Sequence, residues 1–324
     1  DDSIHTYVVE MRQKHPVAVL PSIAYVTKDK IYVGDDAKDA FCDPNSSAHG
    51  QYIKQIKMQL EKKRNNLQYM VDGVTIQGVD IIAEFFKKLR IEAEKHVEYL
   101  EIEMDGVVLG VPVAFDEVAK NVLKAALVKA GFYNSEREAD LKTQFVSEPL
   151  AVAINYGLDL RQDKTVFIFD FGGGTLDTAI VSTHGGRLKV VNCSGDQFLG
   201  GRDIDDVVLK KIILPKMAEE YNIDQNNMAF MRKMLLLAEK CKIKLSTQDV
   251  VEVEVNYDFD PRAMVDADGE EIDFFCEITR EEFERAIKEI IDRAIESAKV
   301  AVEESGINIK QFEKIILVGG TTYI

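Results

Sequence analysis

The sequence is poor in the residues that build metal and disulfide sites. Its 324 residues include 4 cysteines and 5 histidines, and neither set contains a closely spaced pair. Cys42, Cys193, Cys241 and Cys276 are widely separated, which argues against a zinc site of the paired-cysteine kind. We therefore expect reduced structural thiols in an intracellular protein, and a histidine-based metal site has little support.

Long apolar runs and an excess of positive charge are also missing. No run approaches the length needed to cross a bilayer and no signal peptide opens the sequence, so we expect a cytoplasmic protein with no membrane partner. The formal net charge is −16, which would repel a nucleic-acid backbone, so we expect no nucleic-acid partner. Any nucleotide phosphate would have to be neutralised locally, by backbone N–H groups, a divalent ion and a few lysines.

What the chain does contain is an alternation of strand and helix patterns. An apolar run at 107–112 predicts a strand, residues 116–130 predict an amphipathic helix, and residues 143–146 predict a strand that leads into another helix. This order is an α/β pattern, in a chain long enough for one large unit or two lobes. The polar segment 157–164 is the candidate connection between two halves.

The most informative stretch covers residues 165–181. Residues 166–169 predict a buried strand, Asp170 closes it, three glycines follow, and apolar residues resume at Leu176. This order predicts a hairpin rather than the strand-to-helix unit of a Walker or Rossmann site. The triple glycine indicates a turn that needs positive φ or a close backbone approach.

This hairpin has two interpretations. The N–H groups of Gly172 to Thr175 could surround a phosphate, and Asp170 could hold the cation that accompanies it. The alternative is a glycine hairpin flanked by solvated aspartates, and this stretch alone does not decide between them.

Two further glycine turns follow along the chain. A predicted strand at 188–192 leads to Gly200 and Gly201, which precede a predicted helix, and a buried strand at 314–318 runs into Gly319 and Gly320. Each turn follows a strand or precedes a helix, where backbone N–H groups would be free.

A helical pattern at 228–246 places three polar residues on one face. Glu239, Lys242 and Ser246 have the spacing i, i+3 and i+7, so they could grip one polar ligand. The alternative is that they form the solvated side of the helix.

Together these features resemble the nucleotide-binding domain of the heat-shock protein 70 (Hsp70) chaperones. The resemblance runs from Pro21 to Ile324, and its most specific segments are 148–158, 169–177, 195–203 and 317–322. The segment 195–203 separates the chaperone branch from actins and sugar kinases. The resemblance implies an α/β fold of the actin-like ATPase (ribonuclease H-like) kind, with two lobes that clamp ATP, each a mixed sheet flanked by helices with a smaller inserted subdomain.

The same resemblance implies a domain organisation. Residues 1–158 would form lobe I and residues 159–324 lobe II, with an inserted helical and β subdomain at about 204–280. The family's first phosphate hairpin, an Asp-Leu-Gly-Thr-Thr type sequence, is not found, and neither are the helices that follow its last glycine turn. We therefore expect both lobes to be incomplete, and the substrate-binding domain to be missing from this chain.

Site residues follow from the resemblance position by position. The implied catalytic residues are Asp170, Glu148, Lys57 and Asp177, and the implied nucleotide-binding residues are Gly172, Gly173, Gly174, Thr175, Gly200, Gly201, Glu239, Lys242, Ser246, Gly319, Gly320, Thr321 and Tyr323. Asp170 would hold Mg²⁺ through water, and the hairpin would hold the β- and γ-phosphates. Gly200 and Gly201 would approach the phosphates from the other lobe, the trio on the helix would hold the adenosine, and the last turn would line the adenine.

The function implied is an ATP-binding, ATP-hydrolysing domain that uses ATP/ADP and Mg²⁺ and whose lobe closure controls a separate substrate-binding domain. The implied partners are a J-domain co-chaperone and a nucleotide exchange factor. Two alternatives stay open. The missing hairpin, together with Ile243 and Tyr323 in place of the family's base-stacking arginines, favours a non-hydrolysing regulatory or interaction module of the same fold. A sugar- or acetate-kinase relative is disfavoured by the segment 195–203.

Overall fold

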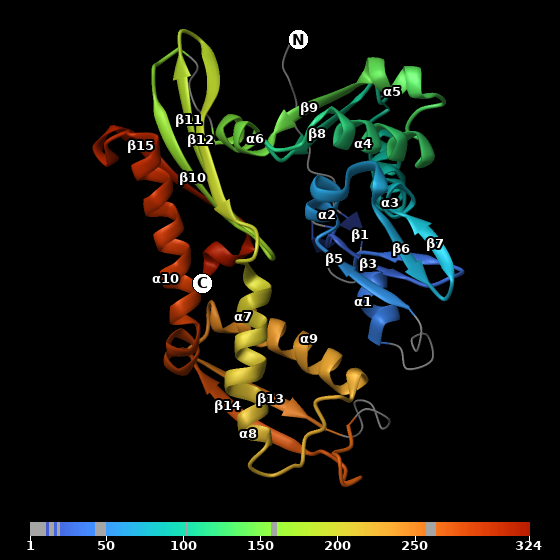
Figure 1. The fold of residues 1–324 in the computed structure, drawn as a ribbon, viewed down its shortest axis with the longest axis vertical. Helices are drawn as coiled ribbons and strands as arrows, with labels where there is room; N and C mark the ends of the chain where they lie inside the picture. The colour runs from blue at the N-terminus through green and yellow to red at the C-terminus, as the bar shows by residue number, and fades with distance from the viewer. Residues whose placement is uncertain are drawn as a thin grey trace. The chain divides into compact units, whose positions relative to one another are not determined.

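The protein divides into two compact units. The computed structural model describes residues 11–12, 16–17, 20–42, 50–101, 103–156, 161–256 and 264–324. The units are Asp1–Glu148 and Pro149–Ile324 (Figure 1). The expected lobe boundary between residues 158 and 159 lies outside the described residues and stays a prediction. Among the helices in these ranges, none combines the length and the apolar character needed to span a bilayer.

The first unit consists of small sheets and helices. Its strands are β1 (Met11–Arg12), β2 (Pro16–Val17), β3 (Ile23–Val26), β4 (Ile31–Val33), β5 (Gln51–Lys54), β6 (Gln68–Val71), β7 (Val74–Gln77), β8 (Val107–Val111) and β9 (Thr143–Ser147). Its helices are α1 (Asp35–Cys42), α2 (Ile56–Lys63), α3 (Gly78–Leu100), α4 (Glu117–Lys129) and α5 (Glu136–Lys142). Among the described residues, β8 and β9 pair in parallel only with each other, so the single mixed sheet expected for this lobe is not seen there.

Helix α4 begins and ends as its sequence predicts. The Asp116 side chain caps it by accepting a hydrogen bond from the Ala119 N–H at 2.9 Å, and Gly131 follows its last turn with φ 82°. The bond from Ala119 and the nearby Arg64 guanidinium hold the pKa of the Asp116 carboxyl below its usual range. The expected strands on either side, β8 and β9, are also confirmed.

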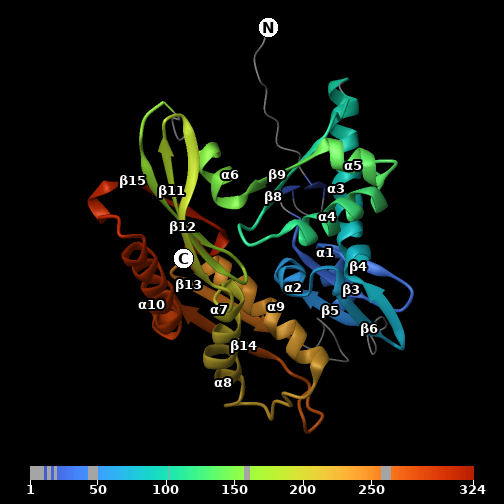
Figure 2. The same ribbon diagram turned by 45° about the horizontal axis from the view of Figure 1, so that its top comes forward.

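The second unit is organised around one mixed sheet. Strands β10 (Thr165–Phe171), β11 (Leu176–His184), β12 (Arg187–Asp196) and β15 (Phe312–Val318) lie in the order β12-β11-β10-β15. Strand β10 pairs antiparallel with β11 and parallel with β15. Helices α6 (Glu148–Asn155) and α10 (Arg280–Ser305) lie on opposite sides of this sheet (Figure 2). The mixed sheet flanked by helices expected for the second lobe is therefore confirmed.

Alternation along β10 explains why both faces of the sheet are covered. Val166 and Ile168 pack with Ala153 of α6, whereas Phe167 packs with Ala301 of α10. Because successive side chains of a strand point to opposite faces, one apolar run supplies both layers. The run is nearly continuous, as expected for a strand that is buried on both sides.

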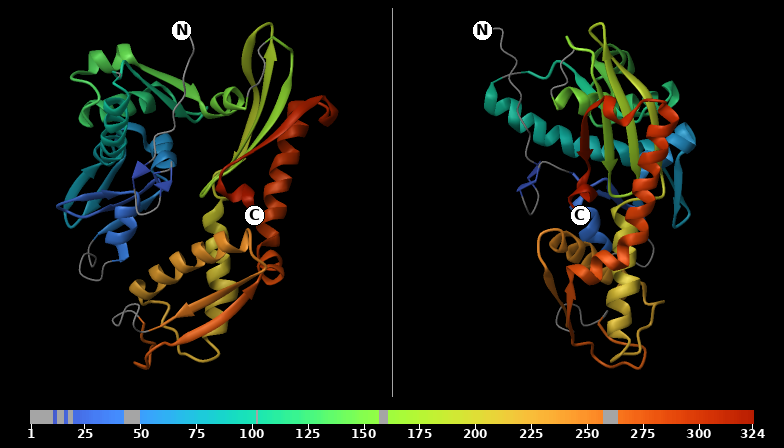
Figure 3. Two further views of the ribbon diagram at one scale, coloured as in Figure 1. Left: turned by 180° about the vertical axis from the view of Figure 1, so that it is seen from behind. Right: turned by 90° about the vertical axis from the view of Figure 1, so that its left-hand side faces the viewer.

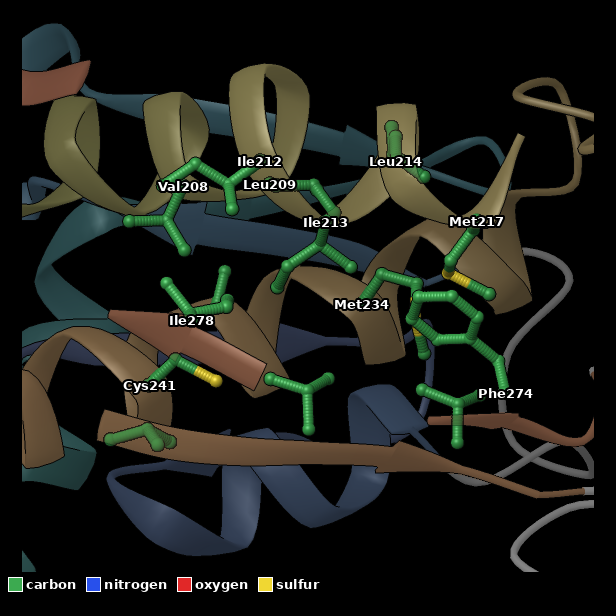
Figure 4. Close-up of a cluster of buried hydrophobic side chains, with 14 of the residues drawn as sticks. Val208, Leu209, Ile212, Ile213, Leu214, Met217, Met234, Cys241, Phe274 and Ile278 are labelled. Carbon is green, nitrogen blue, oxygen red and sulfur yellow. The ribbon is translucent and has the colours of Figure 1, made fainter. Parts of the chain in front are cut away.

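The rest of the second unit surrounds a separate apolar cluster. Its elements are α7 (Gly201–Val207), a π-helical turn (Val208–Ile213), α8 (Leu214–Met217), α9 (Met228–Leu245), β13 (Val250–Val255) and β14 (Phe274–Thr279). Figure 3 shows α9 alongside the antiparallel strands β13 and β14. Figure 4 shows Val208, Ile213 and Met234 converging on the centre of the cluster.

This cluster fixes α7 against α9. Its buried members extend from Ile204 to Ile287, so it covers the expected inserted subdomain at about 204–280, whose bounds stay a prediction. Burial of this many aliphatic side chains is the main force that holds two adjacent helices together. Both helices carry residues that the sequence assigns to the site.

Packing in this cluster makes a prediction about cysteine reactivity. Burial raises the pKa of the Cys241 thiol to about 11, whereas Cys193 on β12 is exposed. Because the thiolate is the reacting species and roughly one in a thousand such thiols is ionised at pH 8, iodoacetamide should modify Cys193 well before Cys241 in the folded protein. Mass spectrometry of tryptic peptides measures both rates. In urea the two rates should converge, and equal rates in the folded protein would contradict the packed cluster.

Candidate functional site

The glycine turn between β10 and β11 is a tight hairpin loop. The strands stay in register up to the pair Phe171–Leu176, and the Gly172 N–H donates to the Thr175 carbonyl at 2.9 Å. The hairpin predicted from the sequence is confirmed. None of its three glycines has a positive φ, so a left-handed conformation is not the reason for glycine at these positions.

The second glycine turn packs directly on the first. A Cβ atom on Gly200 would lie 2.4–2.6 Å from the backbone of Gly174, and no such contact can form without a shift of the chain. The Gly201 N–H, at the start of α7, donates to the Gly172 carbonyl at 3.0 Å. The backbone of the second turn therefore packs directly on the backbone of the hairpin.

The third glycine turn reaches the same place from β15. Parallel pairing sets Asp170 of β10 beside Val318 of β15, immediately before Gly319. Gly319 has φ 88°, and a Cβ atom there would lie 2.3 Å from the Phe171 carbonyl oxygen and 2.7 Å from Asp170 Oδ1. Both the conformation and the contact require glycine at this position. All three turns thus meet at one end of the sheet in the second unit.

A buried threonine completes the contact between the first and third turns. Gly320, which is exposed, opens a 3₁₀ turn (Gly320–Tyr323), and Thr321 within it is buried. The Thr321 hydroxyl donates to the Gly172 carbonyl at 2.8 Å. Thr321 therefore supports the hairpin from beneath, whereas Tyr323 at the end of the turn is 80% exposed.

These contacts determine which way the hairpin amides point. The Gly172 carbonyl accepts from Gly201 and Thr321, and the Gly173 carbonyl accepts from the Arg202 N–H at 3.0 Å and the Arg202 Nε–H at 3.1 Å. Since a trans peptide directs its C=O and N–H to opposite sides, the N–H groups of Gly173 and Gly174 face away from these partners. The Gly173 and Thr175 N–H groups donate to no atom within the described residues.

Two aspartates lie on one face of the sheet, next to the hairpin loop. Asp170 and Asp177 are direct partners across β10 and β11, and opposed residues of an antiparallel pair share a face. The Thr175 hydroxyl donates to Asp177 Oδ2 at 2.9 Å. Nowhere in the described ranges do three side chains gather to hold a metal by themselves. The pair fits Mg²⁺, which keeps several waters and takes phosphate oxygens as further ligands.

The trio on α9 is only partly exposed to solvent. Glu239, Lys242 and Ser246 are all half-buried, which argues against the interpretation as the wet side of a helix. The Lys242 ammonium lies 2.7 Å from Asp205 Oδ1 and donates to the Gly201 carbonyl at 3.1 Å, so it reaches the second glycine turn. The Ser246 hydroxyl instead donates to the Lys242 carbonyl in its own helix, at 3.2 Å.

The two remaining site residues form an ion pair in the first unit. The Lys57 ammonium on α2 donates to both Glu148 carboxylate oxygens, at 2.7 and 2.8 Å. Both side chains keep contact with solvent, with exposures of 48% and 33%. The sequence assigned both residues to catalysis without predicting that they touch.

Comparison with known proteins identifies the family. A family model described as "Hsp70 protein" matches residues 18–324. The chain belongs to the Hsp70 family. The chaperone protein DnaK of Ureaplasma urealyticum is 30% identical over 308 residues, covering 94% of this chain and 47% of that protein. The chaperone protein HscA of Proteus mirabilis is 29% identical over 326 residues, with coverages of 94% and 47%. The chain thus spans about half the length of the curated relatives it matches.

Membership of the Hsp70 family agrees with the actin-like ATPase fold expected from the sequence. One detail of that expectation was wrong. Gly200 and Gly201 lie in the same compact unit as the hairpin and not in the other lobe. The Gly201 N–H donates to the Gly172 carbonyl and thereby supports the turn.

Two residues that hold this Hsp70 site together were not predicted from the sequence. The Arg202 side chain donates a hydrogen bond to the Gly173 carbonyl. The Asp205 side chain, which is 6% exposed, forms an ion pair with Lys242. The sequence offered no clear signal for Asp205, because Arg202, Asp203 and Asp206 in the same helix are charged as well. A carboxylate on a buried helix face requires a cationic partner.

The packing of the turns predicts unequal effects of two glycine substitutions. Gly200→Ala should destabilise the protein by about 1–3 kcal/mol, because its Cβ would overlap the Gly174 backbone. Gly173→Ala should change stability by less than about 0.5 kcal/mol, because a Cβ there meets nothing within 4 Å. Urea unfolding followed by circular dichroism measures both free energies. Equal losses in the two variants would show that the loops do not pack as described.

Proposed function

We propose that this chain binds ATP and ADP with Mg²⁺ as the nucleotide-binding domain of an Hsp70-like chaperone. The observation that carries the proposal is the convergence of three glycine turns at the end of the sheet where Asp170 lies, with the Gly173 N–H turned away from the donors that hold the loop. Backbone N–H groups arranged in a turn form an anion-binding concavity. In a chain of formal net charge −16, such neutral donors bind phosphate without needing a basic surface.

In this proposal, the hairpin binds the phosphates and the two aspartates bind the metal. The amides of Gly173, Gly174 and Thr175 would hold the β- and γ-phosphates, and Asp170 would hold Mg²⁺ through water, with Asp177 close to the metal shell. Glu239 and Ser246 would contact the adenosine, and the exposed ring of Tyr323 could stack on the base.

We also propose that ATP is hydrolysed to ADP and phosphate. Phosphoryl transfer to water depends mainly on positioning and on neutralising the phosphate oxygens. By likeness to the family, the carboxylate of Glu148, which pairs with the Lys57 ammonium at 2.7 Å, would align the attacking water and accept its proton. Bound Mg²⁺ would supply the charge that offsets the triphosphate.

The properties of a whole chaperone are part of the same proposal. The relatives from Ureaplasma urealyticum and Proteus mirabilis are named chaperone proteins and are about twice as long as the matched region. By likeness to that family we propose a cytoplasmic location, a J-domain co-chaperone, a nucleotide exchange factor and a separate substrate-binding domain that reads the nucleotide state.

Binding is tested by isothermal titration of the full chain with ADP and ATP in the presence of Mg²⁺. Asp170→Asn should weaken Mg²⁺-dependent ADP binding about tenfold, because it removes the charge beside the metal. Binding measured in EDTA should change little. Asp292→Asn, an exposed aspartate on α10, is the matched control and should behave as the wild type. A folded wild-type chain that takes up neither nucleotide would refute the proposed function.

Hydrolysis is tested by phosphate release at saturating ATP. Lys57→Met should lower turnover by about a hundredfold, because Glu148 loses the group that orients it, while ADP affinity stays within about twofold. Lys87→Met, which removes another exposed lysine of the first unit, serves as the control. A wild-type chain that binds ATP but releases no phosphate would instead support the non-hydrolysing regulatory module.

A further inference from the structure

The ammonium group of Lys242 is already satisfied by groups of its own unit. It lies 2.7 Å from Asp205 Oδ1, in an ion pair whose angles are not those of a directed hydrogen bond, and it donates to the Gly201 carbonyl at 3.1 Å. The two side chains are 13% and 6% exposed. A lysine has three donors, so these two contacts occupy most of its capacity.

Gly201 links this lysine to the phosphate turn. Its carbonyl accepts from Lys242 Nζ, and its N–H donates to the Gly172 carbonyl at 3.0 Å. A Cβ atom on Gly201 would lie 3.1 Å from Lys242 Nζ and 2.7 Å from Thr321 Oγ1, so the residue fills the space between them. Two hydrogen bonds in series thus connect the ammonium to the loop whose amides face outward.

Burial makes this linkage rigid. Removing a charge pair from water is unfavourable, and it is tolerated only when both partners stay together in one arrangement. Asp205 belongs to α7 and Lys242 to α9, and the apolar cluster packs these helices side by side. The ammonium is therefore held at a fixed point beneath Gly201.

We infer that Lys242 is a positioning residue for the phosphate turn. Held by Asp205, it fixes the Gly201 carbonyl and, through Gly201, the orientation of the peptide between Gly172 and Gly173. The inference rests on the proposed function and changes one part of it. Family resemblance assigns Lys242 to the adenosine, whereas its contacts make it a determinant of affinity for the phosphate end of the nucleotide.

Two fragments of the nucleotide separate these roles. Titration of the full chain with Mg²⁺-pyrophosphate and with adenosine measures the two ends independently. Lys242→Met should weaken pyrophosphate and ADP binding about tenfold, because the turn loses its support, and should leave adenosine binding within about twofold. Weaker adenosine binding with unchanged pyrophosphate binding would overturn the inference, because that is the signature of a lysine that touches the ribose alone.

Further variants separate positioning from general loss of structure. Lys242→Met alone removes the ammonium that faces the buried Asp205 carboxylate, so the double variant Asp205→Asn/Lys242→Met, which removes both charges, is the second test. It should keep the wild-type circular dichroism spectrum and show the same selective loss of pyrophosphate binding. Lys242→Arg, which keeps the positive charge, should recover part of that binding. Wild-type pyrophosphate affinity in the double variant would overturn the inference.

A matched control lies on the same helix. Lys244→Met removes an exposed lysine from α9 and should leave both fragments bound as in the wild type. Failure of the wild type to bind ADP would refute the proposed function itself. Wild-type ADP binding together with unchanged pyrophosphate affinity in every Lys242 variant would refute the positioning role alone.

Discussion

The orientation of two peptide planes is the constraint on which the site depends. A trans peptide cannot present its carbonyl and its N–H to the same side. In the hairpin after β10, the carbonyls of Gly172 and Gly173 are taken by donors from Gly201, Arg202 and Thr321, which turns the following N–H groups outward. The capacity to bind an anion therefore follows from hydrogen bonds made on the other side of the loop.

The fold brings these donors together from distant parts of the sequence. Parallel pairing of β15 with β10 delivers Gly319 and Thr321 to the end of the sheet, and the apolar cluster holds α7 and α9 so that Gly201 and Lys242 meet beneath the turn. Glycine is required at the crossing points because backbone packs on backbone there. Neither the strand pairing nor the cluster includes the residues proposed to contact the phosphates, yet both determine where the N–H donors of the hairpin lie.

Local patterns predicted those parts of the structure that local physics determines. The apolar run, the glycines and the second apolar run specify the β10–β11 hairpin, and the Asp116 side chain specifies where α4 begins. Long-range contacts were beyond such patterns. The Gly201 N–H reaches the Gly172 carbonyl only in the folded protein, and no local sequence pattern predicts this contact. For this reason Gly201 was assigned to the wrong lobe. The pairing of Lys57 with Glu148 depends equally on tertiary structure.

Charge balance explains why the backbone carries so much of the proposed function. Lys57 and Lys242, the two lysines that family resemblance places at the nucleotide, each lie 2.7 Å from a carboxylate, so neither adds net positive charge. The whole chain has a formal net charge of −16. Backbone N–H dipoles and a divalent ion are then the groups that offset the phosphate charge. Asp170, whose Oδ1 lies against the third glycine turn, has the position from which such an ion can serve both the protein and the phosphate.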